Sequence, residues 1–145
     1  MTREQIYSAL FSLIQTACQG AGVVTVSRKL MHWTDVSAQQ QPAVFQIQKD
    51  EEPDQKWKVP TKWKLNVDLY VYVNTSANPN TAPSSLLNPI IDAIEAVLLP
   101  NEPNGPQTLG GLVSHAWISG KIETSEGVLG PQEVAIIPVE ILADQ

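Results

Sequence analysis

The sequence predicts a single α+β domain over residues 1–145. This is a two-layer sandwich in which a mostly antiparallel sheet of four to five strands carries two helices on one face. Residues 62–74, KWKLNVDLYVYVN, place apolar side chains at every second position, which is the period of a strand with one buried face and one solvent-exposed face. Two other segments, 3–18 and 84–99, repeat apolar residues at helical spacing and so predict helices packed along one side.

The first expected element is the helix over 3–18. Thr2 and Gln5 have the spacing of a capping box at its start, and Gly20 follows its end. Its other face is polar, so we expect the helix to lie on the sheet with one side in solvent. The apolar positions are Ile6, Leu10, Leu13, Ile14 and Ala17.

Two strands are expected before the central one. The β-branched run at 23–26 favours a short edge strand, and an irregular, partly exposed connection follows over 27–41. A second strand is expected over 43–48, and Pro42 stands where no ladder hydrogen bond is lost.

Residues 49–61 are expected to form a long hairpin tip that leads into the 62–74 strand. Acidic residues precede a group of lysines, which is typical of a solvated hairpin of mixed charge. Trp57 has two interpretations: a cap folded back on the sheet, or an anchor for a partner, because interfaces are enriched in tryptophan. The candidate interface residues in this segment are Asp50, Glu51, Glu52, Asp54 and Trp57.

A second helix is expected from Ser84 or Ser85, as its cap, to about Leu99, with Pro89 near the first turn. It is the best candidate to pack on the buried face of 62–74, because its apolar stripe is wide. The stripe consists of Leu87, Ile90, Ile91, Ile94, Val97 and Leu98.

The last third of the chain predicts an exposed loop and two strands. The loop over 101–111 supplies three further interface candidates, and a strand over 112–124 with a bulge at Gly120 follows. The final strand is expected over 132–142, where Pro138 favours an edge or a bulge. The three loop candidates are Asn101, Glu102 and Asn104.

Composition excludes several classes of function. A net charge of −6 and a pI of 4.7 argue against a broad phosphate-binding face. Cys18 is the only cysteine, so we expect no internal disulfide and a small buried side chain. No apolar run reaches the length of a bilayer span and no signal-peptide pattern is present. We therefore expect no membrane association, and synthesis in a reducing cytoplasm.

The sequence carries no recognisable catalytic, metal or cofactor motif. His32 and His115 have no partner at ligand spacing, and we expect both to be buried or on strand faces. Neither a G-x-S-x-G nucleophile motif, nor a phosphate loop, nor calcium-loop spacing occurs. We therefore expect neither enzymatic activity nor a bound cofactor or metal.

The order of these elements resembles that of the tail terminator (tail completion) proteins of tailed bacteriophages. The resemblance covers nearly the whole chain and rests on element order, length and pattern. The matching segments are TREQIYSALFSLIQTA, PAVFQIQ, KDEEPDQKW, KWKLNVDLYVYVN, LLNPIIDAIEAVLLP, LVSHAWISGKIETSEG and EVAIIPVEI. No motif is fine enough to transfer to single residues, so the interface candidates rest on position alone.

The resemblance implies a structural role in the virion. Members of the family form a ring, usually of six subunits, at the head-proximal end of the tail tube. The ring stops polymerisation of the tube and offers a docking face to the head connector or head-completion protein. DNA passes through the lumen without specific binding. The implied partners are therefore other copies of the chain, the tube protein and the connector.

Two alternatives stay open. One is another neck or tail component, such as a head–tail joining protein, and the other is a small soluble ligand-binding domain. The charged fraction of 17% is below the usual quarter, which hints at a surface covered by another copy. Self-association separates the readings, because a terminator forms a closed ring and a ligand-binding module stays monomeric or dimeric.

Overall fold

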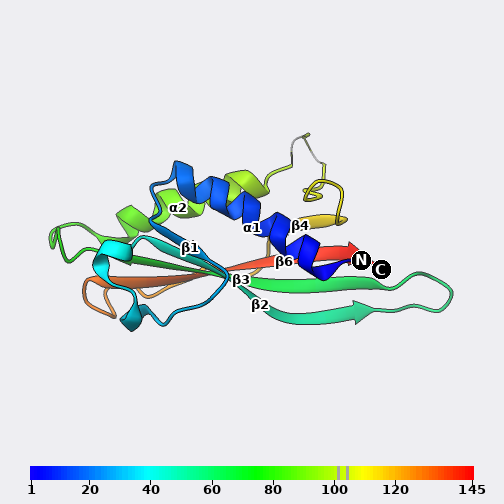
Figure 1. Cartoon of the computed structure of the whole chain (residues 1–145), viewed down its shortest axis with the longest axis horizontal. Helices are drawn as coiled ribbons and strands as arrows, with labels where there is room; N and C mark the ends of the chain where they lie inside the picture. The colour runs from blue at the N-terminus through cyan, green and yellow to red at the C-terminus, as the bar shows by residue number, and fades with distance from the viewer. Residues whose placement is uncertain (101, 104) are drawn as a thin grey trace.

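The computed structural model describes residues 1–100, 102–103 and 105–145. Two helices lie on one face of a six-stranded open sheet (Figure 1). The strand order is β1-β2-β3-β6-β4, with β5 also pairing β6, and every pairing is antiparallel except β1 with β2. The elements are α1 (Arg3–Gly20), β1 (Thr25–Ser27), β2 (Ala43–Asp54), β3 (Lys62–Asn74), α2 (Pro83–Leu98), β4 (His115–Ile118), β5 (Glu123–Thr124) and β6 (Gln132–Asp144).

This architecture confirms the predicted α+β class and the two helices on one face. The sheet has six strands rather than four to five, because the segment predicted as one strand over 112–124 divides into β4 and β5. Gly120 lies between these two strands with φ +105°, a conformation that glycine adopts at little cost. The edge strand β1 lies one to two residues later than predicted, and β6 continues two residues beyond 142.

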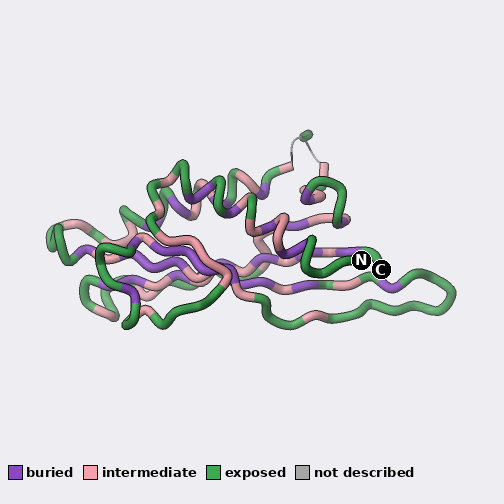
Figure 2. Tube along the Cα trace, viewed as in Figure 1, coloured by how far each residue is buried: buried purple, intermediate pink, exposed green. Residues whose placement is uncertain are grey.

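β3 is the centre of the sheet, as its alternating pattern predicts. It pairs β6 along its entire length and β2 over most of it. Most of β3 is buried beneath the helices, as the burial colouring of the chain shows (Figure 2). Trp63 near the strand start is half-buried. The fully buried side chains facing the helices are Leu65, Val67, Leu69, Val71 and Val73.

The opposite face of the sheet is not uniformly solvent-exposed, and here the expectation of one wet face is wrong. Phe45 and Tyr72 are buried there and their ring centroids lie 5.4 Å apart. Two short 3-10 helices, Trp33–Asp35 and Ala38–Gln40, lie in the connection from β1 to β2, and Val36 between them packs on these rings. The Tyr72 hydroxyl donates a hydrogen bond to the carbonyl of Met31 at 2.7 Å. Tyr72, on the face of β3 opposite the helices, therefore belongs to a second, smaller hydrophobic core.

The structure places Thr2 at the cap position of α1, as predicted, but without the capping box, because its side chain makes no capping hydrogen bond. The predicted cap of the second helix is wrong. α2 begins at Pro83 after Ala82, so neither Ser84 nor Ser85 is its cap, and Pro89 lies in the second turn. Packing rather than caps therefore positions the helices. The core residues that they supply are Ile6, Tyr7, Leu10, Ile14, Ala17, Cys18, Leu87, Ile90, Ile94 and Leu98.

Cys18 is buried in the helix–sheet core, which confirms its predicted role as a small apolar side chain. Burial raises the pKa of its thiol to about 11. Because the thiolate is the reactive form, this side chain stays protonated and unreactive near neutral pH.

Pro138 lies inside β6, which is an interior strand and pairs β3 without a register shift, so the predicted edge or bulge is wrong. Its carbonyl accepts a hydrogen bond from the N–H of Ser119 at 3.0 Å. The N–H and C=O groups of one strand residue point to the same side. The missing N–H therefore falls in the gap between β4, which ends opposite Val139, and β5, which begins opposite Ile136.

A buried carboxyl group lies at the start of α2. Glu133 on β6 is fully buried, and its Oε1 lies 3.1 Å from the hydroxyl of Ser84, which also contacts the carboxylate of Glu126. Burial raises the pKa of Glu133, and the charge of Glu126 adds to this effect against the hydrogen bond from Ser84. The charged form is thus disfavoured in the folded protein.

Replacing Glu133 by glutamine is expected to make the protein less sensitive to rising pH. Because the folded pKa lies above the ordinary value, the stabilisation is present at acidic pH and is lost as pH rises through the folded pKa. Glutamine carries no charge, so Glu133→Gln should gain stability relative to the parent as the pH rises from acidic to neutral. Thermal melts of both proteins across this range measure the difference. If the melting temperatures of the two proteins changed with pH in the same way, the raised pKa of Glu133 would be contradicted.

Candidate assembly interface

The hairpin between β2 and β3 is longer and more regular than predicted. β2 runs to Asp54, so residues 49–54, which were expected in the loop, belong to this strand instead. Residues 51–54 pair with β3, and the turn is confined to 55–61. We call residues 49–64 the arm and residues 55–61 its tip. The arm extends past the ends of the helices and the remaining strands, at the side of the molecule where both termini lie (Figure 1).

A bulge in β2 decides which way the acidic side chains of the arm point. Gln48 lies opposite Val67 and Glu51 opposite Leu65, so β2 contains one extra residue between these pairs. The side chain of Glu51 consequently lies on the helix side of the sheet. The sequence alone predicts no bulge at this position, because no glycine marks it.

Glu51 ties the arm to α1. Its carboxylate accepts hydrogen bonds from Arg3 Nε at 2.6 Å and from the Tyr7 hydroxyl at 2.8 Å. The Arg3 guanidinium also lies 4.8 Å from the centre of the Trp63 ring. Burial and the hydrogen bond to Glu51 raise the pKa of Tyr7. The carboxylate of Glu51 is therefore bound to side chains of its own chain. The sequence had instead suggested Glu51 as an interface residue.

Removing the Glu51 side chain is expected to destabilise the fold by about 1–3 kcal/mol, because it leaves the part-buried Tyr7 hydroxyl and Arg3 without their acceptor. Glu52→Ala is the matched control: that carboxylate is exposed on the next residue, and its loss should change stability by less than about 0.5 kcal/mol. Urea unfolding of the two variants measures both values. Equal losses would show that the contact to α1 contributes nothing.

The remaining acidic candidates are exposed along the arm. Asp50 accepts a hydrogen bond from the Asn66 amide at 2.9 Å. Glu52 lies opposite Lys64 and Asp54 opposite Lys62 across the hairpin. Opposite charges in facing positions favour pairing of the strands, which confirms the predicted hairpin of mixed charge.

Trp57 is 87% exposed, so the interpretation of this side chain as a cap on the sheet is wrong. It stands at the tip between Lys56 and Lys58, which are also exposed, and Val59 beside them is 52% exposed. The tip is thus an apolar point flanked by positive charge. Its use as an anchor for a partner stays a prediction.

Of the three interface candidates in the 101–111 loop, the structure describes one. Asn101 and Asn104 lie outside the described residues, and Glu102 is exposed. After this loop, Gln107 fastens the chain to the end of α2, because its amide donates to the carbonyls of Val97 and Leu99 at 3.1 and 3.2 Å.

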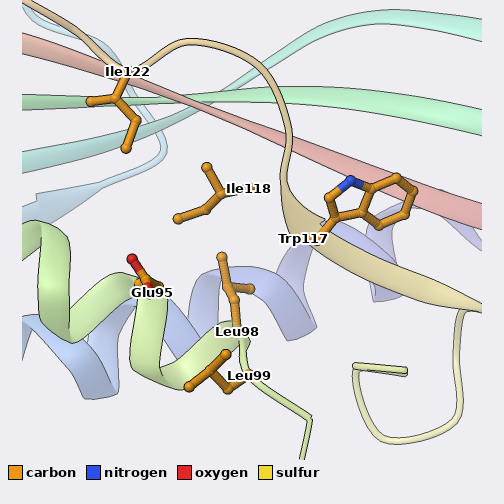
Figure 3. Close-up of a pocket in the computed structure, with 6 residues that line it drawn as sticks. All are labelled: Glu95, Leu98, Leu99, Trp117, Ile118 and Ile122. Carbon is orange, nitrogen blue, oxygen red and sulfur yellow. The ribbon is translucent and has the colours of Figure 1, made fainter. Parts of the chain in front are cut away.

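An apolar groove, which the sequence did not predict, lies between the end of α2 and the β4 edge of the sheet (Figure 3). It encloses about 360 Å³. Side chains from the helix end face those of β4 and the segment after it. The only hint in the sequence is Leu99, an apolar residue between the helix and Pro100 that is 58% exposed. The lining consists of Glu95, Leu98, Leu99, Trp117, Ile118 and Ile122.

No protein-family model and no curated protein sequence matches this chain. The fold, however, has a counterpart in a virus-like particle. It is similar to a chain in the solved structure described as the virion of a native gene transfer agent particle. The TM-score is 0.58 at 8% sequence identity, and the match covers 96% of this chain and 94% of that chain. At this identity, the likeness to the gene transfer agent chain is one of fold.

The two histidines are held by local contacts. His115 lies on β4, as predicted for a strand-face histidine, where its ring stacks on Trp117 and its Nδ1 accepts the N–H of Gln107 at 2.9 Å. His32 is instead exposed and accepts a hydrogen bond from the N–H of Thr34 at the start of a 3-10 helix, so its predicted place is wrong. Among the described residues, no group of three His, Cys, Asp or Glu side chains has the geometry to hold a metal.

Neither α1 nor α2 is both long and apolar enough to cross a membrane, and the same holds for any other helix in the described ranges.

Proposed function

We propose that this chain is a structural protein of a phage-like particle, and more specifically the tail terminator. In that role, residues 1–145 form one domain of a ring at the head-proximal end of the tail tube. The observation that carries the proposal is the match of fold along 96% of the chain to a component of a gene transfer agent virion. The resemblance in element order to tail terminator proteins points the same way.

The sheet has the kind of edges that a ring requires. A closed ring of identical subunits needs two different, complementary flanks on each subunit. β1 pairs only Ala43–Phe45, so in the described chain the outer edge of β2 beyond Phe45 carries no strand. At the other end of the sheet, β4 is the last strand in the order. These two edges differ in length and charge, which suits a head-to-tail contact rather than a symmetric one.

Charge supports passage of DNA without tight binding. A chain of net charge −6 offers little affinity for phosphates, and acidic side chains facing a lumen would repel DNA and let it slide. The proposed partners are further copies of the chain, the tube protein and the head connector or head-completion protein.

The decisive experiment is native mass spectrometry combined with negative-stain imaging over a range of protein concentrations. A closed ring of six subunits with a central hole is the expected result. A protein that stays monomeric or dimeric throughout would favour the ligand-binding alternative. Tail tubes separate the terminator from other neck proteins, because a terminator binds one end of a tube and stops its growth, whereas a head–tail joining protein binds the connector.

The double variant Asp50→Ala/Glu52→Ala is expected to impair ring formation while leaving stability within about 0.5 kcal/mol of the parent, because both carboxylates are exposed on the arm. Glu51 stays unchanged, since its loss would disturb α1. Asp35→Ala, which removes an exposed charge from a 3-10 helix in the β1–β2 connection, is the control. Normal rings from the double variant would remove these acids from the interface.

A further inference from the structure

We propose that the tip of the arm in one subunit docks into the apolar groove of the next copy in the ring. This contact rests on the proposed ring and names the two surfaces that make it. The tip presents Trp57 between two lysines, and the groove presents an apolar hollow beside the acidic face of α2.

The tip has the composition of a binding hot spot. Trp57 is 87% exposed, and tryptophan is among the side chains that contribute most when an interface buries them. The strand pairing of β2 with β3 continues to the pair Asp54–Lys62, immediately before the tip. The two paired strands hold the indole out from the body, so little chain ordering is needed on docking.

The groove has the size and lining to take an indole. A cavity of roughly 150 Å³ already accepts a benzene-sized ring, and the groove encloses about 360 Å³. Leu98, Ile118 and Ile122 supply apolar walls, and Trp117 borders the groove with its ring turned away from Leu98 (Figure 3). An incoming Trp57 would therefore exchange solvent for apolar contacts.

Charge favours the tip as the occupant of the groove. Between residues 55 and 61 the tip carries Lys56 and Lys58 and no acid, in a chain of net charge −6. α2 carries Asp92 and Glu95, both exposed, and no lysine or arginine. Lys121 and Glu123, on either side of the groove residue Ile122, carry opposite charges, so their net charge is zero. Lysines flanking the docked indole thus meet the acidic face of α2.

The contact joins two copies because a tip cannot reach the groove of its own subunit. Ile118 in the groove lies opposite Val139, which lies opposite Val67. From Val67 the arm runs away from the groove to Lys62, a distance of about 16 Å for five strand residues. The tip begins only beyond that point. Two separate surfaces that complement each other generate a head-to-tail chain, and the proposed ring follows when the rotation between neighbouring copies closes that chain.

Cross-linking tests this contact directly. Val59→Cys and Leu99→Cys place thiols on the tip and on the groove rim, at exposed positions that leave Trp57 in place. The two variants, distinguished by mass, are mixed and treated with a short bismaleimide. We expect 59–99 linked pairs in the mixture and none in either variant alone. Cys18 is buried and stays unreacted, as the parent protein verifies.

A second test uses assembly rather than chemistry. Trp57→Ala should raise the concentration needed for half-maximal assembly at least about tenfold, whereas Val128→Ala, which removes another exposed apolar side chain, should not. Lys56→Glu/Lys58→Glu should weaken assembly to a similar extent. Adding Asp92→Lys/Glu95→Lys should restore it, a rescue that a merely structural effect would not produce.

The outcomes distinguish a failure of the docking contact alone from a failure of the proposed ring. Rings that form without 59–99 cross-links and tolerate Trp57→Ala would overturn the docking contact and leave the proposed function standing. Cross-linked dimers of Val59→Cys alone would reveal a tip-to-tip contact and would also overturn it. A parent protein that never assembles, together with a mixture of the two cysteine variants that gives no 59–99 cross-links, would contradict the docking contact and the ring together.

Discussion

Replacing Val71 by aspartate is expected to destabilise the fold by about 4 kcal/mol or more, which places it among the most damaging substitutions in the chain. Val71 is fully buried at the centre of β3, between Val44 on β2 and Ala135 on β6. An aspartate there would be charged without a partner or would have to take up a proton, and either costs free energy. The total stability of a domain is roughly 5–15 kcal/mol, so this single substitution removes a large fraction of it.

Chemical denaturation monitored by circular dichroism measures this effect. Val71→Thr is the matched control, because threonine has nearly the same shape and adds a hydroxyl without a charge, for an expected cost of about 1–3 kcal/mol. Leu69→Asp, two residues away on the same face, should behave like Val71→Asp. If the aspartate variants melted like the parent, this face of β3 would not lie in the core.

Phe45→Ala is expected to cost about 3–5 kcal/mol, although the alternation along β3 predicts a solvent-exposed surface on this side of the sheet. Phe45 is fully buried against Tyr72 and is covered by the segment that connects β1 to β2. Truncation leaves a cavity that the flanking strands cannot fill, because their backbones are held by the ladder on both sides.

Ile47→Ala provides the comparison for Phe45→Ala. Ile47 is the next residue on the same face of β2, but it is only partly buried at the rim of the second core, so its loss should cost about 1–2 kcal/mol. Thermal unfolding of both variants reports the difference. Equal, small losses would show that the second core contributes little to stability.

The parts of the fold that could be predicted are those in which the pattern is local. The period-two alternation of 62–74 fixes which face of the strand is buried, since a shift in register by one residue would expose five buried side chains. Of the six residues in the predicted stripe of α2, four are buried and Ile91 and Val97 are partly buried; the buried four are Leu87, Ile90, Ile94 and Leu98. Capping was predicted less well, because Thr2 lies at the cap position of α1 without a capping hydrogen bond and Ser84 lies inside α2.

The candidate interface was predicted less well than the fold. Glu51 has the same chemistry as Glu52, and only the bulge in β2 turns one carboxylate to Arg3 and Tyr7 and the other to solvent. The groove joins Leu98 to Ile118, which are remote in sequence and carry no joint pattern. Such surfaces depend on long-range packing, which periodicity does not encode.

The sequence by itself determined the α+β class, the central strand, both helices and the buried place of Cys18, because each follows from the spacing of apolar side chains along one segment. Only the tertiary structure decided that residues 49–54 extend β2, that Trp57 stands in solvent at the tip of the arm, and that Phe45 and Tyr72 form a second core. These features depend on which segments lie against one another. The same residue is buried or exposed according to what the rest of the chain places over it.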